Sequence, residues 1–513
     1  MMMTQSNNKR IVKNTLFLYI RMFLMMGISL YTSRIILATL GVTDYGIYNV
    51  VGGVVTMLGF LTGAMSSATQ RFLLVKLGIN DVEGLRTTFH SALLIHFIIA
   101  FIVLFLAETI GLWFLNVQMN IPVTRMEAAN WAYQATVISF AFSLFIVPYN
   151  ASVIAHERMG AFAYIGIFDA VAKLAIAYLL LVIGYDHLIV YSILLLLVGI
   201  ISNLLYIIYA RTHFTECTMN FSLDKEYFKS IMNFAGWNLI GNLAYVVKSQ
   251  GINILINIFC GPAINAARGI GFQVNQAVTS FVTNFQMALN PQITKSHAQG
   301  DMDYLNELIF RGTLYSFYLM LFLSMPILVN THFILSIWLV EVPQYSVEFV
   351  QLAIILSLCD TLYRPLLTAH LATGKIKNLQ IIVGVVNLLN LPVSYFLLKM
   401  GFNVLCTMWV AIAISLITLL LRIFCYCSIE VFPVLNFVKQ VLLRVLLVSL
   451  FAIFSTFILQ FMHSDGWSYF FLSSFYCVVC ITIITYVIGL DKRTKDFLKK
   501  KIRVIMYLSL IHI

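Results

Sequence analysis

Long apolar runs follow one another from near the start of the chain to about residue 490, and short stretches with charges, Pro or Gly separate them. Each run has about 20 residues or more, enough to cross a hydrocarbon core of about 30 Å as a helix. The pattern therefore predicts an all-α polytopic membrane protein with about fourteen transmembrane helices. Their expected cores are 15–40, 45–70, 89–114, 129–153, 161–184, 187–210, 231–259, 263–290, 309–329, 346–369, 378–399, 403–427, 438–461 and 467–490.

Landmark residues recur at an offset near 220. Gly41 and Gly261 are 220 residues apart, and Pro148 and Pro365 are 217 apart. This offset indicates a duplicated six-helix unit, and an even number of spans gives both copies the same topology, related by an axis along the membrane normal. The predicted organisation is two six-helix lobes, two additional helices and a basic cytoplasmic tail, over residues 1–215, 216–430, 431–490 and 491–513.

Composition supports a membrane environment, because 61% of the residues are hydrophobic and only 10% are charged, against about 25% charged in soluble domains. The formal net charge is +11, but the basic residues are spread over short loops and one tail, which fits a membrane surface and no nucleic acid partner. Lys and Arg concentrate in the loops of one side. Both termini are therefore expected on the cytoplasmic side of the cell (inner) membrane.

Four expected helices, at 15–40, 45–70, 231–259 and 263–290, carry polar residues at helical spacing. Such polar faces can join helices through hydrogen bonds of about 0.6 kcal/mol each, or they can face a wet cavity. Arginine favours the cavity, because a guanidinium keeps its proton and a cation within the membrane is rare and usually functional. The candidate substrate-binding residues are Arg21, Arg268, Lys248, Asn49, Asn242, Asn253, Asn275 and Gln286.

Further embedded charges come as acid and base four residues apart. Asp169 with Lys173, and Asp360 with Arg364, can each neutralise one another on one helix face. These pairs are either structural or part of ion coupling and switching between two conformations. Both readings stay open from the sequence.

Signatures of catalysis are absent from the sequence. The extracytoplasmic loops are short, and neither the ten His nor the eight Cys form a metal-binding pattern or a catalytic set. No glycine-rich phosphate loop of the ATPase type occurs either. We therefore expect no enzyme activity, no catalytic or metal-binding residues and no cofactor, and the sequence leaves open whether H⁺ or Na⁺ is a coupling ion.

Three motifs carry a family resemblance: LGVTDYGIYNVV at 40–51, ATQRF at 68–72 and IWL at 337–339. With the fourteen spans, they resemble the polysaccharide-biosynthesis branch of the multidrug/oligosaccharidyl-lipid/polysaccharide (MOP) exporter superfamily, which contains the O-antigen and other lipid-linked oligosaccharide flippases. The resemblance covers nearly the whole chain. It marks the branch without specifying the cargo.

The resemblance implies a MATE-like pair of lobes in a V around a cleft lined by the four polar helices. It implies a flippase that moves an undecaprenyl-diphosphate-linked oligosaccharide from the cytoplasmic to the periplasmic leaflet by alternating access, for surface polysaccharide such as the O-antigen of lipopolysaccharide. The expected partners are this substrate, membrane lipids and other polysaccharide-assembly membrane proteins. Arg21, Arg268 and Lys248 would attract the diphosphate, since arginine matches phosphate oxygens with a fork of donors.

Two other functions fit parts of the sequence. A cation-coupled multidrug exporter of the same superfamily would share the fold but would rely on an embedded carboxylate such as Asp169. A membrane enzyme that polymerises or ligates glycans would need a large extracytoplasmic loop with paired carboxylates, which this chain lacks.

Overall fold

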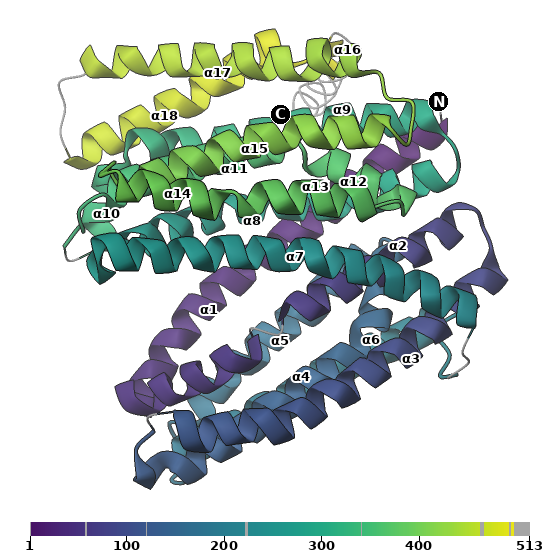
Figure 1. Ribbon diagram of the computed structural model, residues 1–513, viewed down its shortest axis with the longest axis vertical. Helices are drawn as coiled ribbons and strands as arrows, with labels where there is room; N and C mark the ends of the chain where they lie inside the picture. Colours follow the sequence, from purple (N-terminus) through teal and green to yellow (C-terminus); the bar gives the residue numbers. More distant parts are fainter. Residues whose placement is uncertain are drawn as a thin grey trace, which may run out of the picture. The chain divides into compact units, whose positions relative to one another are not determined.

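A computed structural model describes residues 2–56, 59–119, 121–220, 224–339, 341–461, 466–491 and 494–496. All regular secondary structure within these ranges is helical, so the predicted all-α fold class is confirmed (Figure 1). The chain separates into two compact units. The first comprises Met1–Leu243, Met287–Met302 and Ala369–Ile381, and the second comprises Ala244–Gln286, Asp303–Thr368 and Ile382–Ile513.

The first unit contains six helices in chain order, drawn from purple to blue in Figure 1. Helix α4 packs against α6, α3 and α2, while α1 packs against α5, and buried aliphatic side chains fill the space between them. These helices are α1 (Met2–Thr56), α2 (Gly59–Gly78), α3 (Val82–Leu106), α4 (Met126–Ala155), α5 (Met159–Leu179) and α6 (His187–His213). Short π or 3-10 turns at Ala107–Gly111, Phe114–Gln118 and Val123–Arg125 join α3 to α4.

Two long helices, α7 (Lys225–Cys260) and α8 (Pro262–Ala298), contribute residues to both units, and so do the shorter helices α12 and α13. In the second unit α15 packs against α11 and α14, and α17 packs against α18. The remaining helices are α9 (Met302–Val329), α10 (Thr331–Trp338), α11 (Ser346–Thr361), α12 (Arg364–Thr373), α13 (Lys377–Leu388), α14 (Asn390–Lys399), α15 (Cys406–Cys427), α16 (Val434–Phe437), α17 (Leu443–Thr456) and α18 (Gly466–Ile484). Further π or 3-10 turns lie at Val438–Leu442, Phe457–Phe461 and Thr485–Gly489. The lobe boundary at residue 215 stays a prediction.

Eleven helices of the described chain are long and apolar enough to cross a membrane, or twelve when α11 and α12, bent by 42°, count as one span. Each of the fourteen expected ranges lies mostly on helix where the chain is described, although 161–184 runs past the end of α5 at Leu179. The expected spans at 45–70 and 263–290 do not meet the apolarity criterion. Both are among the helices with polar faces, which lowers their mean hydropathy.

Gly41 and Gly261, the first pair of repeat landmarks, both have a positive φ angle. Their φ angles are +73° and +84°, and each lies at a helix junction: a kink within α1 for Gly41 and the step from α7 to α8 for Gly261. A residue with a Cβ is strained at positive φ, by about 1–3 kcal/mol, which explains glycine at both positions. The shared geometry supports the internal repeat.

Replacing Gly261 with alanine should therefore lower the free energy of unfolding by about 1–3 kcal/mol through backbone strain. No neighbouring atom lies within 4 Å of the added Cβ, so the loss would not come from a clash. The measurement is thermal unfolding of the purified protein in detergent. Gly236→Ala is the matched control, because Gly236 lies in helical backbone of α7 with equally open space, and an unchanged or raised stability of Gly261→Ala would contradict the strain.

Arg125 joins three segments of the first unit at one end of its helices. Its Nε donates to Asp44 Oδ1 at 2.8 Å, and its Nη2 donates to Asp186 Oδ1 at 3.0 Å. Asp186 also accepts from the Leu188 and Ile189 backbone amides at the start of α6. Asp44 belongs to the first family motif, and its bond to Arg125 gives this motif residue a structural role.

Asp186 lies outside the membrane-spanning segments, and hydrogen bonding to the Arg125 guanidinium holds its pKa below its ordinary value. A lowered pKa in the folded protein stabilises the fold at pH above the ordinary aspartate value of about 3.8, and the contribution is lost as the pH falls through the lowered pKa. Asp186→Asn should cost about 1–3 kcal/mol at neutral pH. Thermal unfolding measured against pH should show the difference in stability between the two proteins shrinking as the pH falls below about 3.8. A difference that stays constant with pH would contradict this prediction.

Candidate functional site

Arg21, on α1 of the first unit, is a half-buried cation held against α5. Its guanidinium lies 4.4 Å from the centre of the Phe162 ring and packs where Gly166 leaves room for it. Among the described residues its buried Nε has no hydrogen-bond partner. The charge of Asp169 acts on Arg21, but no ion pair joins the two in the described part of the chain. An anion that reached this position would find a free donor.

Asp169 pairs with Lys173 at 2.7 Å, as the four-residue spacing predicts. It also accepts from Ser202 Oγ on α6 at 3.2 Å. Because the carboxylate already has these two partners, its geometry fits a structural pair. Whether it also couples an ion stays a prediction.

Arg268, on α8, meets Asn253, on α7, inside the second unit. Arg268 is 7% exposed, donates from Nη1 to Asn253 Oδ1 and lies 4.5 Å from the centre of the Phe272 ring. Its buried Nε has no hydrogen-bond partner among the described residues. Two of the candidates on different helices are thus in direct contact, and a donor of the guanidinium is left over.

Lys248 and an arginine that the sequence analysis did not select share the surroundings of Arg268. Lys248 Nζ donates to Asn387 Oδ1 on α13 at 3.0 Å, and the charges of Asp360, Arg268 and Arg422 act on Lys248. Arg422, on α15, stacks 4.4 Å from the Tyr363 ring with its buried Nε unpartnered in the described structure. Arg422 lies five residues before the end of α15, the last span of the repeat, where a basic residue is common and gives no sign of a binding site.

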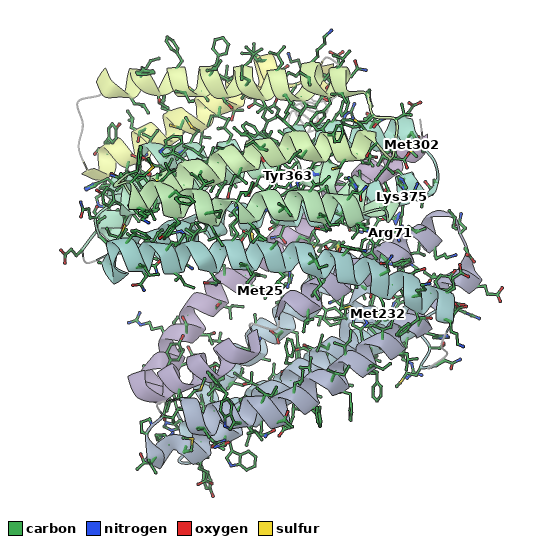
Figure 2. All side chains as sticks on the ribbon, viewed as in Figure 1. Met25, Arg71, Met232, Met302, Tyr363 and Lys375 are labelled. Carbon is green, nitrogen blue, oxygen red and sulfur yellow. The ribbon has the colours of Figure 1, made fainter. Side chains whose placement is uncertain are left out.

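The structure does not form the expected pair of Asp360 and Arg364, since no ion pair joins them within the described residues. Asp360 instead accepts from Ser415 Oγ at 2.6 Å. The physical reason is the 42° bend between α11 and α12, so the two residues lie on different helices, not one turn apart on a single helix. Tyr363, labelled in Figure 2, lies at this bend.

We call five charged residues of the second unit the cation cluster: the carboxylate Asp360 and the four cations Lys248, Arg268, Arg364 and Arg422. The charges of Asp360 and Arg364 act on Arg422, and those of Asp360, Arg364 and Arg268 act on Tyr245 on α7. Among the described residues, four cations and one carboxylate are thus linked by electrostatic interactions, either directly or through Tyr245. Burying charge without compensation costs free energy, which makes an excess of three positive charges in one helical bundle a candidate site for an anion.

The remaining candidates have different surroundings. Asn275 Nδ2 donates to Ser357 Oγ at 2.8 Å, and Gln286 Nε2 donates to Ser316 Oγ at 3.1 Å. Both side chains therefore join neighbouring helices, which is the structural alternative to lining a wet cavity. Asn242 belongs to the first unit and is partly exposed. The Asn49 side chain lies outside the described residues. No group of His, Cys, Asp and Glu suited to a metal occurs in the described part of the chain.

Arg71, from the second family motif, has a structural contact of its own. Its Nε donates to the carbonyl oxygens of Leu371 at 3.0 Å and Ala372 at 3.2 Å, both in the last turn of α12 (Figure 2). Carbonyl groups at a helix end lack partners within the helix and carry partial negative charge. Arg71 therefore stabilises a helix end within the first unit.

Comparison with known proteins finds a match to one family model over part of the chain and a shared fold with solved structures. Residues 239–396 match the model of the MatE family, whose members are transporters and not enzymes, in agreement with the expectation that the chain is no enzyme. No match was found among curated proteins. The matched region contains Lys248, Arg268 and Asp360 of the cation cluster.

Solved structures of MATE transporters share the fold over most of the chain. A MATE protein in complex with MaD3S aligns with a TM-score of 0.69 at 13% identity, covering 82% of this chain and 96% of that one. An outward-facing multidrug resistance MATE transporter of the MOP superfamily gives 0.69 at 12% identity, covering 83% and 97%. A MOP superfamily transporter from Pyrococcus furiosus, described as having a binding pocket of reverse polarity, gives 0.68 at 11% identity, covering 81% and 95%.

Proposed function

We propose that this protein, which has the MATE transporter fold, is a flippase for an undecaprenyl-diphosphate-linked oligosaccharide. It carries this cargo from the cytoplasmic to the periplasmic leaflet by alternating access during surface polysaccharide synthesis. The observation that carries the proposal is the excess of buried and half-buried cations, namely Arg21 in the first unit and the cation cluster in the second. The fold gives the class of protein, and these charges suggest the chemistry of the cargo.

Embedded cations favour an anionic cargo for an energetic reason. An arginine near the centre of a membrane helix costs about 2.5–3.5 kcal/mol on insertion scales, and a guanidinium does not escape this cost by losing its proton. Arg21, Arg268 and Arg422 each keep an Nε without a partner among the described residues. A diphosphate supplies both the missing charge and the missing acceptors, and its oxygens match the donor fork of arginine.

The amide side chains around the cluster suit the sugar part of the cargo. Asn387 is bound by Lys248, and Gln250 by Asn253, so amide groups lie next to the cations that would hold the phosphate. Amides can both donate to and accept from sugar hydroxyls. In this proposal the diphosphate is bound first by charge, and the sugars are positioned by neutral hydrogen bonds.

Loop charge supports the orientation that this function needs. Lys and Arg concentrate in the loops on one side, which favours a cytoplasmic location of both termini in the cell (inner) membrane. Membrane lipids and other membrane proteins of polysaccharide assembly are the proposed partners. The division into lobes at residues 1–215 and 216–430, with additional helices at 431–490, remains part of the proposal.

A cation-coupled multidrug exporter is the second candidate, because one of the similar structures is described as a multidrug resistance transporter. Such a protein would need an embedded carboxylate free to bind the coupling ion or the cargo. Asp169 is bound by Lys173 and Ser202, while Asp360 accepts a hydrogen bond from Ser415 and interacts electrostatically with Lys248 and Arg422. Resistance to organic cations that is gained with the protein and lost with Asp169→Asn would favour this candidate over the flippase.

The proposed function is tested in cells that lack the protein. The lipid-linked oligosaccharide should then accumulate on the cytoplasmic leaflet, as measured by its accessibility to a membrane-impermeant glycan-modifying enzyme applied from either side. Restoring the protein should return the precursor to the periplasmic leaflet. An unchanged distribution, with the same amount of surface polysaccharide, would overturn the proposal.

A further inference from the structure

A cation-lined cavity lies in the first unit at the start of α1, and neither Arg21 nor any residue of the cation cluster belongs to its lining. It has a volume of about 680 Å³ and lies between the start of α1, the turn from α4 to α5, and α6. Arg10, Lys13 and Arg158 contribute three positive charges to its lining. A cavity of this size admits a phosphate headgroup, and its charge selects an anion.

The acidic residue in this lining is already neutralised. Glu157 is fully buried and binds Arg10 Nε at 2.8 Å, Lys295 Nζ at 2.7 Å and Gln292 Nε2 at 2.7 Å. Lys13 and Arg158 form no ion pair within the described residues. The free charge in the cavity is therefore positive.

Asn14 supplies an unused hydrogen-bond donor at the same place. The side chain is 5% exposed and lines the cavity, and its buried Nδ2 has no partner among the described residues. Leaving a buried polar group without a partner costs about 1–3 kcal/mol. An acceptor oxygen in the cavity would remove that cost.

The start of α5 adds backbone donors. Met159, Gly160 and Ala161 form its first turn and line the cavity, and no side chain caps this end of the 21-residue helix. The first amide groups of a helix lack partners within the helix and carry partial positive charge, so they bind phosphate groups well. Charge, a buried amide and a helix start thus converge on one cavity.

The position of the cavity indicates a lipid as the carrier of the anion. Spans begin at Arg10 and Met159 and end at Ala155 and His213, so the cavity lies at the level where helices leave the membrane. Aromatic side chains, which prefer the headgroup level, belong to its lining: Tyr164 is 66% exposed and meets Phe17 edge-on at 6.1 Å.

We propose that this cavity is a binding site for a phosphate group carried by a membrane lipid, held by Lys13, Asn14, Arg158 and the start of α5. The site is distinct from the residues assigned to the cargo, because it includes neither Arg21 nor any residue of the cation cluster. A lipid bound here would anchor α1 to the turn between α4 and α5 at the membrane surface.

The test compares two sources of phosphate on the full-length purified protein. Retained phosphatidylglycerol and phosphatidylcholine are counted by native mass spectrometry after detergent extraction, and binding of radiolabelled inorganic pyrophosphate is measured by equilibrium dialysis. The variants are Arg158→Gln and the nearly isosteric Asn14→Asp, which would repel an anion without changing the shape of the cavity. Arg86→Gln removes an exposed arginine of α3 outside the cavity and is the matched control.

We expect saturable retention of phosphatidylglycerol over phosphatidylcholine, weakened about tenfold or more in both variants and unchanged in Arg86→Gln, since a hydrogen bond to a charged group contributes about 1.5–3 kcal/mol. If pyrophosphate binds and its binding is also weakened in both variants, the site would be an anion site for a soluble phosphate, which overturns the assignment to a lipid. Equal retention of both lipids, or binding that both folded variants preserve, would overturn the proposal.

Discussion

Arg268→Gln should lower the translocation of lipid-linked oligosaccharide about tenfold or more while the protein still inserts and folds. The guanidinium is 7% exposed, holds Asn253 and keeps an unpartnered Nε, so the substitution removes both the charge and the donor fork proposed to bind the diphosphate. A lost hydrogen bond to a charged group of about 1.5–3 kcal/mol corresponds to a decrease of about ten- to a hundredfold. The readout is the fraction of precursor on the periplasmic leaflet.

Two further variants separate charge from position. Arg268→Lys keeps the charge but loses the two-pronged geometry, so translocation should fall between that of wild type and that of Arg268→Gln. Arg34→Gln removes an exposed arginine of α1 and should leave translocation near the wild-type level. Normal translocation by folded Arg268→Gln would contradict the assignment of the cation cluster to the cargo.

Glu157→Gln should produce the largest loss of stability, about 3–5 kcal/mol, because it leaves Lys295 close to an uncharged partner in a buried position. The carboxylate joins Arg10 on α1 with Lys295 and Gln292 on α8, and its own backbone has a positive φ of 58°. Such a conformation is uncommon for a residue other than glycine and is maintained by its surroundings. Denaturant-induced unfolding of the purified protein is the measurement.

A double variant identifies the cause of that loss. If the cost comes from the stranded lysine, Glu157→Gln with Lys295→Gln should be less destabilised than the sum of the two single variants. Glu127→Gln, which removes an exposed carboxylate at the start of α4, is the control and should change stability by less than about 0.5 kcal/mol. Additive effects of the two single variants would contradict the buried ion pair.

The sequence predicts the helices well because an apolar segment in hydrocarbon must satisfy its backbone hydrogen bonds internally, which an α-helix does. Gly41 and Gly261 were recognisable as repeat landmarks, and their positive φ angles give the physical reason for their recurrence. The Asp169 and Lys173 pair also follows from spacing on one continuous helix. These features depend on local geometry, which periodicity describes directly.

Contacts between distant segments were harder to predict. Arg364 lost its expected partner Asp360 because the helix bends between them, and spacing alone does not reveal a bend. Arg422 resembled an ordinary helix end, and its approach to Lys248 depends on how α15 packs. The sequence did not single out Glu157 as a paired carboxylate. Its partners Arg10 and Lys295 each lie more than 130 residues away from it along the chain. Tertiary packing decides all of these contacts.

The most direct test of the central claim is translocation by the purified protein alone. The protein is reconstituted into liposomes that contain a fluorescent undecaprenyl-diphosphate-linked oligosaccharide, and the fraction of label that an added membrane-impermeant quencher can reach is followed over time. The flippase account predicts that label protected in the inner leaflet becomes accessible with wild-type protein and remains protected with Arg268→Gln. Label that stays protected with folded wild-type protein, under a proton gradient, a sodium gradient or neither, would contradict it.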